Sequence, residues 1–375
     1  MQDDARALYA GLGARPVINA VGNMTMLGGS TPSPRVRRAM ETASRYWVDM
    51  DELLAGSGRV VAGMLGCQAA LVTSGCAGAL VLGTAACMTG TDAERMMRLP
   101  DTTGMKGEVV IQKGQRFKYD RVVRMTGARL VEAGSAVGTS AEELHAAMGL
   151  QTAALLYPAH DQRPGLVPLR QAIEVAHGRG VPVLVDAASR VYPVDGLKQY
   201  AAWGADLVGY GAKYFGAPNS TGLLCGREDL VEAARLHTFA CFETRGLGGF
   251  GRPLKVDRQE VAAVVEALRE WLEMDHGARY AAARARAGRL RAALAGLPHA
   301  AVEDPGPAGS EVVRLALDEG ALGRSAAQVT ASLRQADPAV WLVTEGPCLV
   351  LYLMTVPDGD EEVVAQQLKR ALQAA

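Results

Sequence analysis

Short apolar segments alternate with longer segments of helical composition through the middle of the chain. The short segments are rich in Val, Leu, Ile and Ala and fall at 70–74, 109–112, 128–132, 153–157, 181–186, 206–209 and 222–225. Several lack any polar alternation, which indicates strands that are buried on both faces of a sheet. Segments 140–148 and 169–179 lie between them and are predicted helices. The pattern predicts an α/β fold with a large, mostly parallel seven-stranded sheet and helices on both sides.

The pattern changes after about residue 255. A long Ala-, Arg- and Glu-rich stretch over 257–294 predicts a helix, with a break near 275–277. Shorter strands are predicted after it, at 299–302, 312–317, 340–344 and 349–355, before a final helix at 360–374. This region reads as a smaller α/β C-terminal lobe with an antiparallel sheet.

Composition narrows the classes of protein. Hydrophobic residues make up 49% of the 375 residues and charged residues 21%, which excludes a wholly disordered chain. The 39 Lys and Arg balance 40 Asp and Glu, so a broad nucleic-acid surface is not expected. The six cysteines form no CxxC pair and suggest reduced, mostly buried thiols. No signal peptide and no apolar run long enough for a membrane span is visible, so we expect a cytoplasmic enzyme without membrane or nucleic-acid partners.

Two charged residues at strand ends are candidates for chemistry. Asp186 ends the most hydrophobic strand, where α/β sheets place ligands, and an ionised Asp there can hold a proton on a heteroaromatic nitrogen. A helix-capping role is the alternative. Lys213 follows the next strand among glycines and small residues, where a desolvated lysine can act as an amine nucleophile. Its alternative is a surface loop lysine. One strand–helix–strand step separates the two residues, so both can reach one crevice.

A third candidate element is the strand-to-helix turn at Ser74-Gly75-Cys76, which we call the phosphate loop. Its free backbone N–H groups and the following helix N-terminus suit an anion, although close-packed turns often look the same. Together the three elements predict pyridoxal 5'-phosphate (PLP). The phosphate would lie on this loop, the pyridine nitrogen on Asp186 and the aldehyde on Lys213 as a Schiff base.

The ordered set of motifs resembles the fold-type I PLP enzymes, and more narrowly the branch of bacterial selenocysteine synthase and D-glucosaminate-6-phosphate ammonia-lyase. The resemblance covers nearly the whole chain and rests, besides the Asp186 and Lys213 segments, on 15–30, 112–120 and 251–257. It implies an aminotransferase-like architecture divided into an N-terminal segment over the active site (1–45), a large PLP-binding domain (46–255) and a small domain (256–375). It also implies a homodimer or higher homo-oligomer.

Two positions depart from the pattern of the relatives. Gln115 stands where relatives usually have a histidine that stacks on the pyridine ring, and an amide cannot titrate. Tyr210 stands where relatives tend to have a serine, so its hydroxyl either contacts the phosphate or the ring packs. Both departures bear on the activity more than on the cofactor.

Further residues are candidates for substrate or cofactor contacts. The resemblance places Arg252 and Lys255 near the substrate, where two cations could hold an acidic group; a solvated helix start is the alternative. Polar residues among the glycines of the N-terminal segment could fold over the site or form an ordinary loop: Asn19, Thr25 and Ser30. Ser189 could meet the phenolic oxygen of the cofactor, and His160 could face the pocket or be a loop histidine.

The leading functional hypothesis is a PLP-dependent lyase. It would act on a small β-hydroxy amino acid or amino sugar acid by α,β-elimination, with Lys213 taking the α-proton, to give a 2-oxo acid and ammonia. The elimination comes from the resemblance, whereas the residues supply the cofactor chemistry. A racemase, an aldolase or an aminotransferase uses the same Lys–Asp pair. A tRNA-dependent transferase like selenocysteine synthase, and a non-catalytic PLP carrier, are remote alternatives.

Overall fold

Residues 3–160, 162–304, 306 and 309–373 are described by the computed structural model, and the contacts divide the chain into two compact units. The large unit comprises Gly29–Glu273. The small unit combines the chain up to Gly28 with the chain from Met274 onward. These boundaries lie at 28 and 273, whereas the sequence suggested 45 and 255.

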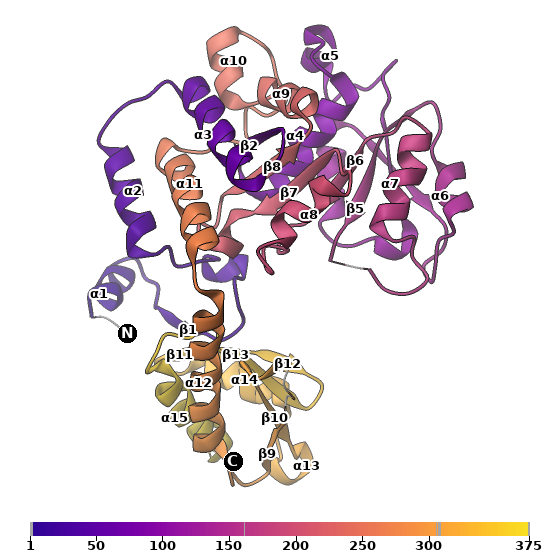
Figure 1. Cartoon of the computed structure of the whole chain (residues 1–375). Helices are drawn as coiled ribbons and strands as arrows, with labels where there is room; N and C mark the ends of the chain where they lie inside the picture. The colour runs from indigo at the N-terminus through magenta and orange to yellow at the C-terminus, as the bar shows by residue number, and fades with distance from the viewer. Residues whose placement is uncertain (1–2, 161, 305, 307–308, 374–375) are drawn as a thin grey trace. The chain divides into compact units, whose positions relative to one another are not determined.

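The large unit is built on a seven-stranded sheet with the order β2-β8-β7-β6-β5-β3-β4 (Figure 1). Its strands are β2 (Ala69–Thr73), β3 (Glu108–Gln112), β4 (Arg129–Ala133), β5 (Thr152–Pro158), β6 (Val183–Asp186), β7 (Leu207–Gly211) and β8 (Gly222–Gly226). β3, β4, β5, β6 and β7 are parallel, and β8 is antiparallel to both of its neighbours. The α/β fold and the mostly parallel seven-stranded sheet are therefore confirmed.

The large unit also contains helices, some of which pack against this sheet while others pack on those helices. They are α2 (Pro34–Ser44), α3 (Met50–Leu65), α4 (Gly75–Thr89), α5 (Ala93–Arg98), α6 (Ala141–Ala147), α7 (Leu169–Gly178), α8 (Gly196–Ala202), α9 (Glu228–Leu236), α10 (Phe239–Arg245) and α11 (Arg258–Glu273), with 3-10 turns η2 (Lys113–Gln115), η3 (Asp120–Thr126) and η4 (Ala212–Phe215). α4 contacts β5, β6, β7 and β8, and most of its residues are buried. A helix that is apolar all round is buried on all sides, and its N-terminus is therefore fixed against the sheet edge.

Packing between α2 and α11 explains why the large unit extends beyond the expected boundaries. Arg35 of α2 donates to Glu273 of α11 at 2.6 Å and pairs with Glu266. Arg258 at the start of α11 donates to the Ala43 carbonyl oxygen at 3.0 Å. These pairs join chain segments more than 200 residues apart, which local sequence patterns do not reveal. The expectation that residues 1–45 cover the active site stays a prediction.

The small unit has an antiparallel sheet with the order β12-β13-β10-β9 and a separate parallel pair, β1-β11. Its elements are α1 (Asp3–Gly11), β1 (Val17–Asn19), η1 (Thr25–Leu27), α12 (His276–Leu294), β9 (Ala300–Glu303), β10 (Val312–Leu317), α13 (Glu319–Leu322), α14 (Ala326–Gln335), β11 (Ala339–Trp341), β12 (Val343–Glu345), β13 (Cys348–Tyr352) and α15 (Asp360–Gln373). Leucine and valine side chains from the sheet, α12, α14 and α15 form its core.

Two local expectations in this unit have different outcomes. The single strand predicted at 340–344 is wrong, because the segment breaks at Leu342: β11 pairs with β1, and β12 pairs with β13. The break predicted near 275–277 is confirmed, since α11 ends at Glu273 and the Asp275 carboxylate caps α12 by accepting the Ala278 N–H at 2.9 Å. The last predicted helical residue, Ala374, lies outside the described residues.

Two further features concern the cysteines and the lengths of the helices. All six cysteines have free thiols, three of them buried and three partly buried. Within the described ranges, no helix combines the length and the apolarity that a membrane crossing requires.

Candidate active site

Three of the expected site elements meet at one edge of the seven-stranded sheet. Asp186 ends β6 and pairs in register with Pro158 of β5 and Gly209 of β7. Lys213 lies in η4, directly after β7, and the phosphate loop follows β2. The carboxyl ends of parallel strands share one edge, where open α/β sheets bind ligands. The structure thus brings together the residues that the sequence proposed for one crevice.

Glycines hold the phosphate loop tightly against β8. Gly75 has φ +70°, and a Cβ on Gly222 would lie 2.3 Å from the Gly75 carbonyl carbon, so both positions require glycine. The Ser74 hydroxyl is buried and has no hydrogen-bond partner among the described residues. It lies over the first turn of α4, where a Cβ on Gly78 would be 2.6 Å away. A buried, unpartnered hydroxyl beside a helix N-terminus fits a phosphate group.

The Asp186 carboxylate is buried, with 5% of the residue exposed. Its Oδ1 accepts hydrogen bonds from the Ala188 N–H at 3.0 Å and from the Cys76 thiol at 3.4 Å. Burial raises the pKa of Asp186, whereas these two donors lower it. A protonated ring nitrogen next to this carboxylate would stabilise its charged form. The Cys76 side chain therefore contacts Asp186, a role that the sequence did not predict for it.

Lys213 is half-buried, and its Nζ lies 5.2 Å from the centre of the Tyr214 ring. Burial lowers the pKa of Lys213, which favours the neutral amine. A neutral amine is the form that reacts with an aldehyde and that accepts a proton. Lys213 is therefore partly shielded from water, and its role as a nucleophile stays a prediction.

Gln115 is buried at the end of η2, with both ends of its amide engaged. Its Oε1 accepts from Gln112 at 3.1 Å, and its Nε2 donates to the Pro158 carbonyl oxygen at 3.4 Å. The neighbouring strand end carries His160, which is exposed and whose ring centre lies 4.7 Å from that of Phe117. His160 also interacts electrostatically with Asp186. His160 thus lies beyond the carboxyl end of β5, at the same sheet edge as Asp186.

Of the two roles considered for Tyr210, the structure agrees with packing of its ring and not with a phosphate contact. Its ring is buried, and its hydroxyl donates to the Leu197 carbonyl oxygen at 2.8 Å. The hydroxyl is thus already satisfied at the start of α8, and the expected contribution of Tyr210 to the phosphate has no support. Ser189 is exposed in the loop after β6, and its expected contact with the cofactor stays a prediction.

The expected substrate-binding cations lie in the loop before α11. Arg252 donates to Glu243 at 2.7 Å, and its guanidinium lies 5.8 Å from the centre of the Phe242 ring, while Lys255 is exposed. The buried His237 anchors this loop, because its Nδ1 accepts the Phe250 N–H at 3.3 Å. His237 was not predicted from the sequence, because no motif surrounds it.

Two other expected site residues belong to the small unit. The Asn19 carboxamide binds the Val21 N–H and the Gly22 carbonyl oxygen, and Thr25 begins η1. Their roles at the site stay predictions. Ser30 lies in the large unit and donates to the Ala217 carbonyl oxygen in the loop that follows η4.

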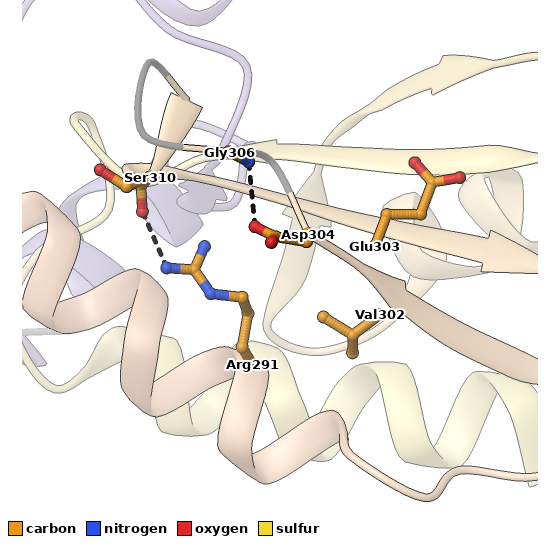
Figure 2. A pocket seen from close by; sticks show the side chains of 6 residues that line it. All are labelled: Arg291, Val302, Glu303, Asp304, Gly306 and Ser310. Atoms are coloured by element: carbon orange, nitrogen blue, oxygen red, sulfur yellow. Dashed lines mark hydrogen bonds between the residues drawn. The ribbon is translucent and has the colours of Figure 1, made fainter.

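A pocket of about 310 Å³ lies in the small unit (Figure 2). It is lined by Arg291, Val302, Glu303, Asp304, Gly306 and Ser310. Arg291 already donates to the Ser310 carbonyl oxygen at 2.9 Å, and none of the expected site residues lines the pocket. Among the described residues, no group of three or more His, Cys, Asp or Glu side chains is arranged to hold a metal ion.

The sheet order, the lysine after β7, the carboxylate at the end of β6 and the loop after β2 define a fold-type I PLP enzyme. The family model of SelA, L-seryl-tRNA selenium transferase, matches residues 36–283. The chain is 35% identical to 5'-C-glycyluridine monooxygenase-decarboxylase of Streptomyces sp, over 95% of this chain and 90% of that protein. It is 32% identical to D-glucosaminate-6-phosphate ammonia lyase of Salmonella typhimurium, over 70% of each chain. A solved structure of D-glucosaminate-6-phosphate ammonia-lyase superposes with a TM-score of 0.88 at 27% identity, covering 98% of both chains.

The chain therefore belongs to the SelA family. It is a PLP-dependent enzyme of the lyase class, as the sequence predicted. The described residues fit the cofactor, since an unpartnered Ser74 hydroxyl, a buried carboxylate and a partly desolvated lysine stand at one sheet edge.

Proposed function

We propose that this enzyme removes the β-hydroxyl group from a β-hydroxy α-amino acid and yields a 2-oxo acid and ammonia. The similarity in structure to D-glucosaminate-6-phosphate ammonia-lyase, with a TM-score of 0.88 over 98% of both chains, carries this proposal. D-glucosaminate 6-phosphate and 5'-C-glycyluridine, as compounds, are both α-amino acids with an oxygen on the neighbouring carbon. The two relatives therefore support the same substrate class.

The residues at the sheet edge have distinct roles in this proposal. PLP, when bound, provides the electron sink for the pair released as the α-proton leaves. The Ser74 hydroxyl and the N–H groups at the start of α4 hold its phosphate, and Asp186 keeps the proton on its ring nitrogen. Lys213, with a pKa lowered by burial, is the base that takes the α-proton. Water leaves from the β-carbon and water re-enters at the α-carbon, so the net products are the 2-oxo acid and ammonia.

On the substrate side, the cations of the loop before α11 bind the acidic group. Arg252 and Lys255 are three residues apart, and Arg252 is held by Glu243 at 2.7 Å. A guanidinium held by one carboxylate keeps N–H donors for a second anion, because its five donors form a planar fork. We propose that this loop binds the substrate carboxylate or a phosphate at the far end of the substrate.

A second candidate is oxidative decarboxylation of the same class of amino acid. It is favoured by the relative of 35% identity over 95% of the chain, a monooxygenase-decarboxylase, and by Gln115. Departure of a hydroxyl group requires a proton, which an amide cannot deliver, whereas loss of carbon dioxide breaks a bond that needs none. Gln115 therefore cannot be the acid that protonates a leaving hydroxyl group.

The test is a product assay on the purified holoenzyme with D-glucosaminate 6-phosphate, serine and threonine. Release of ammonia and 2-oxo acid in equal amounts without oxygen consumption supports elimination. Release of carbon dioxide with oxygen consumption supports the second candidate. Lys213→Ala should abolish either reaction, whereas Lys198→Ala, an exposed lysine on α8, should leave it unchanged. No product from any β-hydroxy amino acid would refute the proposed function.

A further inference from the structure

Three ring side chains are contiguous beside the candidate active site, in a chain that has only 5% aromatic residues. The Phe117 ring centre lies 5.9 Å from that of Tyr119, with the planes at 71°, and 4.7 Å from that of His160. We call these three residues the ring cluster. They come from two loops that follow β3 and β5, so the cluster is not a product of neighbouring sequence positions alone.

The ring cluster adjoins the residues assigned to the cofactor. His160 comes two residues after Pro158, which pairs with Asp186, and the Ala159 N–H donates to the Asp186 carbonyl oxygen at 2.8 Å. Tyr214, the neighbour of Lys213, interacts electrostatically with both Tyr119 and Asp186. The rings are therefore continuous with the sheet edge at which the substrate would react.

The outer part of the cluster is open. Tyr119 is 53% exposed, and tyrosine is a side chain that is enriched at binding interfaces. The Lys118 ammonium lies 4.8 Å from the centre of the Tyr119 ring, and the Arg190 guanidinium donates to the His160 carbonyl oxygen at 2.9 Å. Within the described residues, no further ring contacts Tyr119 beyond Phe117. A second planar group can thus stack on the open side.

We propose that the ring cluster stacks on a planar heterocycle of nucleobase size that the substrate carries beyond its β-carbon. This inference rests on the proposed function, because it extends the β-hydroxy amino acid to one with a heteroaromatic substituent. An acyclic sugar acid has no planar face to offer such rings, so the cluster distinguishes the two kinds of substrate. Stacking of this kind tolerates different bases, because each base has a π-face.

The test uses uridine as a probe, since it has the base but no amino acid to react. Its binding to the holoenzyme is measured by isothermal titration calorimetry, and we expect saturable binding that Tyr119→Ala weakens about tenfold and Tyr119→Phe preserves. Tyr46→Ala, which truncates a 71% exposed tyrosine in the loop after α2, should leave uridine binding unchanged. Ribose alone should not bind at the site.

Three outcomes would overturn the inference. The first is the absence of uridine binding up to the solubility limit of uridine. The second is an equal loss of uridine affinity in Tyr119→Ala and Tyr46→Ala. Loss of PLP from Tyr119→Ala, read from the absorbance of the protein, would show that the rings hold the cofactor instead. Ammonia release from a sugar acid without uridine binding would refute this inference and leave the proposed function intact. Uridine binding without turnover of any amino acid would refute the proposed function and leave the stacking site intact.

Discussion

The free energy of unfolding should change with pH in part because of one buried imidazole, that of His237. This residue is 0% exposed, its Nδ1 accepts the Phe250 N–H at 3.3 Å, and its Nε2 lies 2.9 Å from the Thr89 hydroxyl. Since Nδ1 accepts, Nε2 carries the proton and donates to Thr89. A second proton on the ring would displace the Phe250 N–H, which lies in the loop that leads to Arg252.

The magnitude follows from the difference in pKa between the folded and unfolded chain. Burial lowers the pKa of His237 from an ordinary 6.5 to about 4. Above 6.5 the imidazole is neutral in both states, so its contribution to stability is fully present there. As the pH falls below 6.5, the unfolded chain takes up a proton that the folded chain refuses, and stability declines. The loss is about 2 kcal/mol at about pH 5 and approaches about 3 kcal/mol below the folded pKa.

The assay is urea unfolding of the wild type and of His237→Gln at about pH 7.5 and about pH 5. The glutamine is less stable at the higher pH, but it does not titrate, so its stability should fall by about 2 kcal/mol less between the two pH values. Thr89→Ala is the matched control, because it removes the partner of Nε2 and keeps the imidazole. It should retain the pH dependence of the wild type. Equal pH dependences of the wild type and His237→Gln would refute the reasoning.

Two further predictions concern the cofactor site. Cys76→Ala removes the thiol donor to Asp186, which lies 3.4 Å away, and should weaken PLP binding in equilibrium dialysis about fivefold, since a net hydrogen bond contributes about 1 kcal/mol. Cys87→Ala, on the same helix but without contact to Asp186, should bind PLP like the wild type; parallel losses in both would contradict the assigned role. Gly222→Ala places a Cβ 2.3 Å from the backbone of the phosphate loop and should lower both PLP affinity and the free energy of unfolding, the latter by about 1–3 kcal/mol. Gly63→Ala lies in the interior of α3, and its Cβ would meet no atom within 4 Å outside the backbone of that helix, so it should keep the PLP affinity and should not lower the free energy of unfolding. A Gly222→Ala protein with normal PLP affinity would argue against a phosphate at this loop.

The sheet and the positions of Asp186 and Lys213 at its edge were predictable because they follow from local patterns. Most β-strands of the large unit are short apolar runs, and runs that are buried on both faces are recognisable without their partners. Asp186 and Lys213 could be paired in advance because strand order along the chain places their strand ends at the same edge.

Other features could not be predicted because they depend on contacts between distant segments. The break at Leu342 follows from the pairing of β11 with β1, more than 300 residues earlier. The Tyr210 hydroxyl donates to the carbonyl oxygen of Leu197, and the Cys76 thiol donates to Asp186, which lies 110 residues further along the chain. In each case the partner lies in another element of the chain, so only the tertiary fold reveals it.

Reaction choice in this site depends on where a proton for a leaving group comes from. The Gln115 amide is engaged at both ends by Gln112 and Pro158, so it neither titrates nor turns toward a substrate without losing two buried hydrogen bonds. Gln115 therefore provides no acid–base group at the end of β3. The neighbouring strand end presents His160, an imidazole within electrostatic range of Asp186. A proton for a leaving hydroxyl group would therefore have to come from a group other than Gln115, and His160 in the loop after β5 is the candidate that lies within electrostatic range of Asp186.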